Sequence, residues 1–163
     1  MAITRLNNNS ITSVTALPSG IDVGKVGQII QGQANTQIST SLSIDQDIVT
    51  QSITPTATSS KILIIGSIMG IQSNNNHINT RWNCKVYRDS TLIMTSGANR
   101  WDFTTNYERD GGFAINWLDS PSSTSSLNYR FTSNWSDTGG GTCYVNTDGN
   151  SGYSTITLME ILT

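Results

Sequence analysis

The stretch Lys61-Ile62-Leu63-Ile64-Ile65-Gly66-Ser67-Ile68-Met69-Gly70-Ile71 decides the fold class, because after Lys61 it carries no charge and is apolar on both faces of a strand. Isoleucine is β-branched and suits a pleated strand better than a helix. The preceding Thr54-Pro55-Thr56-Ala57-Thr58-Ser59-Ser60 is typical of a turn. The pattern therefore predicts a central strand of a sheet, covered on both faces.

Shorter strand patterns recur along the rest of the chain and are separated by Gly, Pro, Asn and Ser turns. They lie at 26–30, 44–53, 80–88, 91–94, 113–118, 127–135, 142–145 and 154–162. The pair 80–88 and 91–94 reads as a hairpin, and no segment shows a convincing helical period. Seven to nine short strands predict an all-β fold, an antiparallel jelly-roll-like β-sandwich of two sheets.

The composition restricts the partners of this 163-residue chain, which has the size of one domain. Charged residues make up 12%, compared with about 25% in an average soluble protein, and the net charge is −2. Without a basic surface, nucleic-acid binding is not expected. The longest apolar run, 62–65, is far shorter than the roughly 20 residues of a membrane span, so membrane insertion is not expected. The first residues lack the apolar stretch of a signal peptide, which indicates synthesis in a cytoplasm without secretory export.

The first 24 residues differ from the rest, because they are polar, lack aromatic residues and contain widely spaced aliphatics. These aliphatics are Ile3, Leu6, Ile11, Val14 and Leu17. Alone, such a segment cannot bury enough apolar surface to offset its ordering entropy. A solvated tail is one interpretation. We favour an extended N-terminal arm, residues 1–24, that anchors the sandwich domain, residues 25–163, to another subunit of a particle.

The residues of common catalytic and metal sites give no sign of an enzyme. His77 is the sole histidine and follows three asparagines in an expected loop. Cys84 and Cys143 fit reduced, half-buried strand positions, and two cysteines with one histidine do not make a zinc site. The carboxylates of Asp102, Glu108, Asp110 and Asp119 could pair as in a glycosidase, but they match no motif. We predict no catalysis, no cofactor and no metal.

Aromatic residues near expected loops offer a different kind of site. Trp101, Tyr107, Trp135 and Tyr153 could stack on sugar rings if they are exposed. They could equally fill the core of the sandwich or an apolar subunit interface.

Several stretches resemble a jelly-roll domain found in virion proteins of cyanophages and other marine phages. They are Ser52-Ile53-Thr54-Pro55-Thr56-Ala57-Thr58-Ser59-Ser60-Lys61-Ile62-Leu63-Ile64, Val86-Tyr87-Arg88-Asp89, the closing Ser154-Thr155-Ile156-Thr157-Leu158-Met159-Glu160-Ile161, and the opening Ala2-Ile3-Thr4-Arg5-Leu6-Asn7-Asn8-Asn9-Ser10-Ile11. The resemblance implies a homotrimer in a bacteriophage virion, with each arm fastened to capsid or tail proteins and the jelly rolls outside.

The sequence thus favours a short tail-fibre or appendage protein, assembled into the virion in the host cytoplasm and in contact with host cell-surface glycans. A capsid decoration protein that stabilises the head is one alternative. A carbohydrate-binding module that acts on its own is another.

Overall fold

The computed structural model describes residues 25–40, 44–73, 80–96, 99–101, 111–136, 143–146 and 153–163. Within these residues the chain forms eleven β-strands. They are β1 (Lys25–Ala34), β2 (Ile38–Thr40), β3 (Gln46–Ile53), β4 (Lys61–Ser73), β5 (Thr80–Arg88), β6 (Thr91–Thr95), β7 (Asn99–Trp101), β8 (Gly111–Asp119), β9 (Leu127–Ser136), β10 (Cys143–Val145) and β11 (Ser154–Leu162). The proposed arm, residues 1–24, lies outside the described residues.

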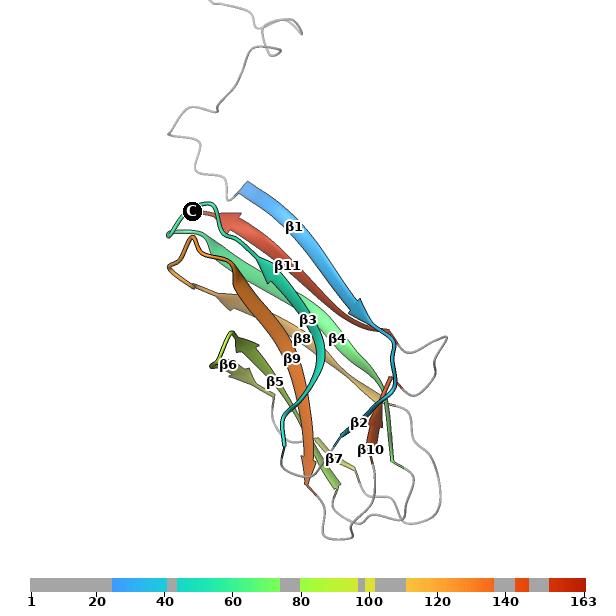
Figure 1. Cartoon of the computed structure of the whole chain (residues 1–163). Helices are drawn as coiled ribbons and strands as arrows, with labels where there is room; N and C mark the ends of the chain where they lie inside the picture. Colours follow the sequence, from blue (N-terminus) through green and yellow to red (C-terminus); the bar gives the residue numbers. More distant parts are fainter. Residues whose placement is uncertain are drawn as a thin grey trace, which may run out of the picture.

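The strands form two antiparallel sheets that pack face to face (Figure 1). The six-stranded sheet has the order β1-β11-β4-β10-β2, with β8 on the other side of β4. The five-stranded sheet has the order β3-β9-β5-β6, with β7 also paired to β5. In the described chain the start of β1 and the C-terminus lie at the same end of the sandwich (Figure 1).

Three pairs of short strands are halves of longer, interrupted ones, and this makes the topology a jelly roll. β11 and β10 pair with successive parts of β4, β1 and β2 continue the sheet beside them, and β6 and β7 both pair with β5. Counted as whole strands along the described chain, the orders become 1-8-3-6 and 2-7-4-5. Eight antiparallel strands in this order form a jelly roll, so the predicted fold class is confirmed. The predicted count of seven to nine was too low because the three-residue strands β2 and β7 were missed.

The core lies between the sheets and is filled by the inward side of each strand. Ile62, Ile64, Ile68 and Ile71 of β4 are fully buried. The large aromatics Trp82, Tyr129, Phe131 and Trp135 cover them from the five-stranded sheet, each at most 1% exposed. Burial of such apolar side chains provides most of the free energy that holds the two layers together.

Two glycines allow close approach between strands and sheets. A Cβ on Gly66 of β4 would lie 2.6 Å from Cε2 of Phe131 and would also collide with the carbonyl oxygen of Thr155. A Cβ on Gly32 of β1 would lie 2.8 Å from the carbonyl oxygen of Thr50 in β3. Glycine at these positions lets Phe131 pack onto β4 and lets β1 and β3 close one side of the sandwich.

A buried carboxylate fastens the end of the sandwich at which β1 begins. Glu160 is fully buried and accepts hydrogen bonds from the N–H of Thr56 (2.6 Å), the hydroxyl of Thr56 (2.8 Å) and Nε2 of Gln28 (2.8 Å). Gln28 lies in a β-bulge of β1 and also donates to the carbonyl oxygen of Thr54. These bonds join β1, β11 and the β3–β4 connection.

A second polar cluster sits where the interrupted strands break. Gly70 has a φ of 61° at an irregularity in β4, and the N–H of Asn146, after β10, donates to the carbonyl oxygen of Met69. Asn146 also bonds Ser154 and the carbonyl oxygen of Thr36, and both Asn146 and Ser154 are fully buried. The cluster satisfies backbone groups that the broken ladder leaves unpaired.

Candidate interaction surface

The outer face of the six-stranded sheet carries an apolar patch near the end where β1 begins. Residues opposite each other in an antiparallel pair point to the same face. The registers therefore place Ile29, Met159, Leu63 and Leu118 in one row across β1, β11, β4 and β8. We define the apolar patch as Val26, Ile29, Leu63, Ile65, Leu118, Met159 and Ile161.

Much of this patch is open to solvent in the single chain. Val26, Ile29, Ile65 and Leu118 are 41–59% exposed, and the other members are half-buried. Lys61 lies at one margin, next to Ile161 in the register. Towards the other end of the sheet the outer face becomes polar, with Gln33, Thr155 and Ser67 in one row. Contiguous exposed apolar side chains of this kind mark interaction surfaces.

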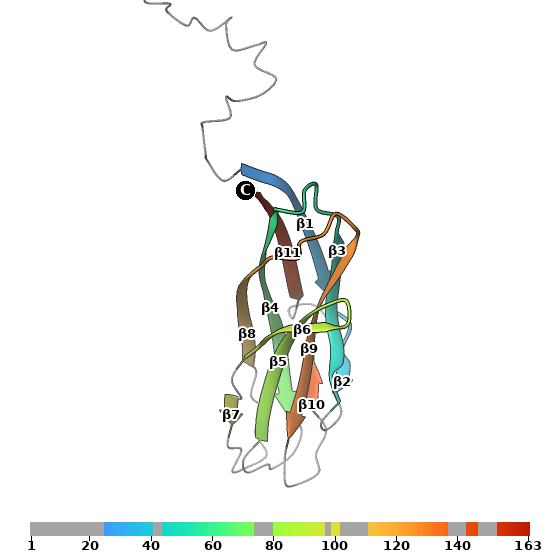
Figure 2. The ribbon, with the colours of Figure 1, turned by 90° about the vertical axis from the view of Figure 1, so that its left-hand side faces the viewer.

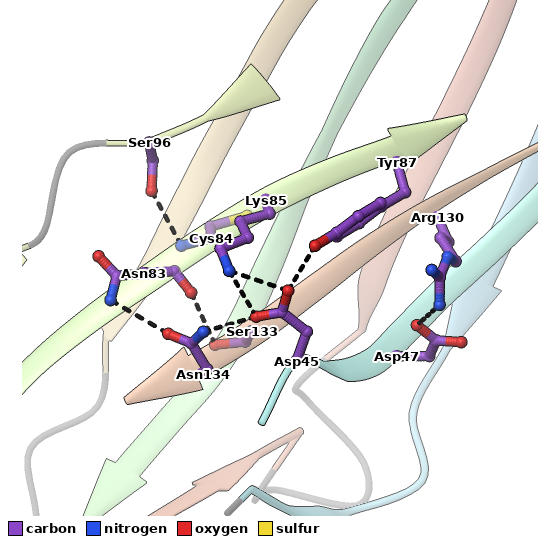
Figure 3. Close-up of polar contacts among 10 residues, drawn as sticks. All are labelled: Asp45, Asp47, Asn83, Cys84, Lys85, Tyr87, Ser96, Arg130, Ser133 and Asn134. Atoms are coloured by element: carbon purple, nitrogen blue, oxygen red, sulfur yellow. Dashed lines mark hydrogen bonds and ion pairs between the residues drawn. The ribbon is translucent and has the colours of Figure 1, made fainter. Parts of the chain in front are cut away.

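The outer face of the five-stranded sheet is polar and its side chains bind one another (Figure 3). Asp45 forms an ion pair of 2.8 Å with Lys85 and accepts hydrogen bonds from Tyr87 and Asn134. Arg130 forms an ion pair of 2.7 Å with Asp47, and its guanidinium lies 4.6 Å from the centre of the Tyr87 ring.

The same contacts set the charge state of this face. Burial alone would raise the pKa of Asp45, but the hydrogen bonds from Lys85, Tyr87 and Asn134 and the charge of Lys85 outweigh it and lower that pKa. Asp45 therefore stays ionised, and its partners are occupied by contacts within the chain. This face suits solvent, in contrast to the apolar patch.

The edge strand β8 is joined to the other sheet near its C-terminal end. The carboxylate of Asp119 accepts a hydrogen bond of 2.6 Å from Nη1 of Arg88 and one of 2.7 Å from the hydroxyl of Tyr129. Burial, followed by the hydrogen bond to Asp119, raises the pKa of Tyr129 far above its usual value, so this hydroxyl stays protonated. Asp119, considered above as a catalytic carboxylate, is thus a buried bridge between the sheets.

The predicted glycan-contact residues are not brought together by the described structure. Tyr153 is exposed just before β11. Trp135 lies in β9 and is 1% exposed, so of the two alternatives left open, glycan contact and core, the structure contradicts glycan contact: the strand turns its indole into the core. The side chain of Trp101 and all of Tyr107 lie outside the described residues. Trp117 of β8 is an exposed aromatic that the sequence analysis did not single out.

The predicted anchoring residues and most of the chemical candidates fall outside the part of the chain that the structure describes. Ile3, Leu6, Ile11, Val14 and Leu17 lie outside the described residues, as do His77, Asp102, Glu108 and Asp110. In the part of the chain that the structure describes, no group of His, Cys, Asp and Glu could hold a metal ion, and no helix could cross a membrane. Cys84 and Cys143 are buried thiols, more deeply placed than predicted, and burial raises the pKa of Cys84 to about 12.

Residues 61–71 are apolar on both faces of the strand, and this pattern was the sequence signal for the apolar patch. It was interpreted as a strand covered on both faces. β4 does lie between β11 and β8, and its inner face is buried, but within the described residues nothing covers Ile65 and Met69 on the outer face. The second apolar face of this strand belongs to the surface.

No protein-family model matches the chain, and no curated protein sequence matches it. Solved structures with similar folds include VP2 proteins of infectious bursal disease virus. The VP2 subviral particle has 12% identity and a TM-score of 0.48, over 83% of this chain and 33% of that one. The T13 viral particle of this virus has 12% identity and a TM-score of 0.47, over 91% and 41%. The Gt strain has 13% identity and a TM-score of 0.44, over 99% and 54%. The chain spans about a third to a half of these proteins, and likeness at this level does not extend their role to it.

Proposed function

We propose that the chain is a structural component of a virus particle, a short bacteriophage fibre or appendage protein whose jelly rolls associate as a homotrimer. The observation that carries the proposal is the contrast between the two outer faces of the sandwich. One carries the apolar patch, and the other is closed by ion pairs and hydrogen bonds of its own. Covering the apolar face of such a chain with another molecule is favourable, because it removes apolar surface from water.

Further copies of the same chain cover the patch in this proposal. The row Ile29, Met159, Leu63 and Leu118 has no charged member, so two such faces can meet without an unpaired buried charge. Lys61 lies at the margin, where it keeps contact with water, as in the polar rim of most interfaces. The net charge of −2 gives only weak repulsion between copies. The number three comes from the resemblance to phage virion proteins.

The arm, residues 1–24, attaches this trimer to other virion proteins. The described chain starts at Lys25, next to Val26 of the apolar patch. In a trimer built on the patch, the arms therefore begin beside the interface and close to one another. The sequence of the arm, with Ile3, Leu6, Ile11, Val14 and Leu17 among polar residues, suits docking along an apolar groove.

Contact with host surface glycans is a second role that the same particle protein would serve. The exposed ring of Tyr153 favours glycan contact. Trp101 and Tyr107 also remain candidates for this contact. Trp135 is no longer among them, because it is buried.

The experiment is the solution mass of the full chain, measured by light scattering at two protein concentrations. The proposal predicts a mass near three times the 17.6 kDa of one chain, unchanged on dilution. A mass of one chain at both concentrations would contradict the trimer.

A further inference from the structure

The sheet edges of the sandwich differ in how they are protected. An edge strand exposes unpaired N–H and C=O groups, and proteins usually guard it with a bulge, a charge, a proline or a cover. β1 has a bulge, starts with Lys25 and lies against β3 through Gly32. β3 has a bulge beside Asp47, and β6 is five residues long with an irregular register.

Among the described residues β8, Gly111–Asp119, is the least protected edge: the irregularity in its pairing lies in β4, between Ile68 and Ile71, opposite the first residues of β8. Its sequence, Gly-Gly-Phe-Ala-Ile-Asn-Trp-Leu-Asp, contains no lysine, arginine or proline, and its terminal Asp119 is buried in the bridge to Arg88. Among the described residues β8 pairs with β4 and with no other strand. It runs along the left-hand margin of the molecule in Figure 2.

We propose that β8 accepts a further strand, formed by residues 10–17 in the arm of a neighbouring copy of the chain. The inference rests on the proposed function, since it assumes an assembly of several copies. It assigns residues 10–17 of the arm to a neighbouring copy and leaves residues 1–9 for contact with other virion proteins. Addition of a strand to a free edge is a common way for an extended segment to bind, because main-chain hydrogen bonds provide the affinity.

The donor segment has the composition of a strand. Residues 10–17 read Ser-Ile-Thr-Ser-Val-Thr-Ala-Leu, with four β-branched residues and no charge, and Pro18 ends the stretch. Its eight residues match the nine of β8 in length. Side chains alternate along a strand, so with Leu17 beside Gly111 the added strand would place Val14 and Ala16 on the outer face and Ile11 and Leu17 on the inner one.

Geometry favours a neighbour's arm over the chain's own. Lys25 and Asp119 lie at the same end of the six-stranded sheet. An antiparallel strand aligned with all of β8 would place Leu17 beside Gly111, at the far end. Leu17 would then be about 25 Å along the strands and about 19 Å across them from Lys25, roughly 31 Å in all. The eight residue steps from Leu17 to Lys25 span at most about 28 Å when fully extended. Over the full length of β8 the chain's own arm could pair only in parallel, whereas the described strand pairs are all antiparallel.

The experiment is disulfide formation between two forms of the full chain that are co-expressed with different tags. One form carries Asn116→Cys on the exposed outer side of β8. The other carries a single cysteine in the arm, introduced in turn at residues 11 to 15. A bond between the two tags is necessarily a bond between copies. The matched control replaces Asn116→Cys by Ser52→Cys, an exposed position on the outer face of the five-stranded sheet.

We expect cross-links at alternate arm positions, because side chains of a strand alternate between its faces, and several-fold less cross-linking to Ser52→Cys. Equal cross-linking at all five positions, or equal yield with Ser52→Cys, would overturn the strand addition. A third form that carries both cysteines tests the chain's own arm. Bonds found only inside chains of that form, and none between the two tags, would overturn the assignment to a neighbour. If light scattering gives a trimer and no bond forms, the inference fails and the proposed function stands; a mass of one chain contradicts the trimer itself.

Discussion

The carboxylate of Glu160 accepts a hydrogen bond of 2.6 Å from the backbone N–H of Thr56, which ties the last strand to the connection between β3 and β4. Burial alone would raise the pKa of Glu160, but the bonds from Thr56 and Gln28 outweigh it and lower that pKa to about 2. Among the described residues Glu160 forms no ion pair, and its buried charge is tolerated because hydrogen-bond donors surround it.

Replacing Glu160 by glutamine should destabilise the fold by about 1–3 kcal/mol. The new NH2 group is a hydrogen-bond donor and would point at the donor groups of Thr56 or Gln28, where the carboxylate oxygen now accepts. Urea unfolding of the full chain measures this free energy. Asp47→Asn is the matched control: Asp47 is largely exposed, and loss of its surface pair with Arg130 should cost at most about 1 kcal/mol. Equal effects of the two changes would contradict the role of Glu160.

The low pKa of Glu160 also predicts how stability depends on pH. Its ordinary value is 4.5, and in the folded chain it is about 2, so the folded state favours the ionised form. The stabilisation is complete above pH 4.5 and is lost as the pH falls from there towards 2. Asp45, whose pKa is also lowered, contributes in the same direction. Melting temperatures between pH 7 and 2 should fall less steeply in Glu160→Gln than in the native chain; parallel curves would contradict this assignment.

Gly66→Ala should destabilise the chain by about 1–3 kcal/mol, because the new methyl group would collide with the ring of Phe131 and with the backbone of Thr155. Ser67→Ala, one residue further along β4 on the outer face, should have little effect. Thermal unfolding of both variants tests the close approach of Phe131 to β4. A fully stable Gly66→Ala would show that the sheets can separate there without cost.

Both cysteines should resist thiol reagents in the native chain. Cys84 and Cys143 are fully buried, and burial raises the pKa of Cys84 to about 12, so its thiolate is scarce at neutral pH. Titration with a chromogenic disulfide reagent at pH 8 should give slow reaction in buffer and two rapid equivalents in denaturant. Rapid reaction of either thiol in buffer would place that cysteine at the surface.

The sequence predicted the fold class well because strand periodicity and turn residues are local signals. The hairpin of β5 and β6, for example, follows from alternating residues on both sides of Asp89-Ser90, and Asp89 has the positive φ of a tight turn. The division between β10 and β11 was predicted, at 142–145 and 154–162, but the one between β1 and β2 was missed, because it involves the distant Asn146, whose amide bonds the carbonyl oxygen of Thr36.

The candidate surface was harder to predict, because it depends on the register of four strands. Ile29, Leu63, Leu118 and Met159 are far apart in the sequence and meet only when β1, β4, β8 and β11 align. Trp135, in contrast, was a candidate for the surface and is buried. It was named among aromatics near expected loops, with surface and core both open, and the side of β9 on which it lies faces the core.

The most direct test of assembly through the apolar patch is the solution mass of the double variant Ile29→Asp with Leu118→Asp. Both side chains are exposed in the single chain, so the fold should tolerate the charges, while an interface built on them should not. Leu92→Asp, at an equally exposed leucine on the five-stranded sheet, is the control. Light scattering should give one chain for the double variant and three for the native chain and the control. A trimeric double variant with an unchanged melting temperature would contradict assembly through the apolar patch.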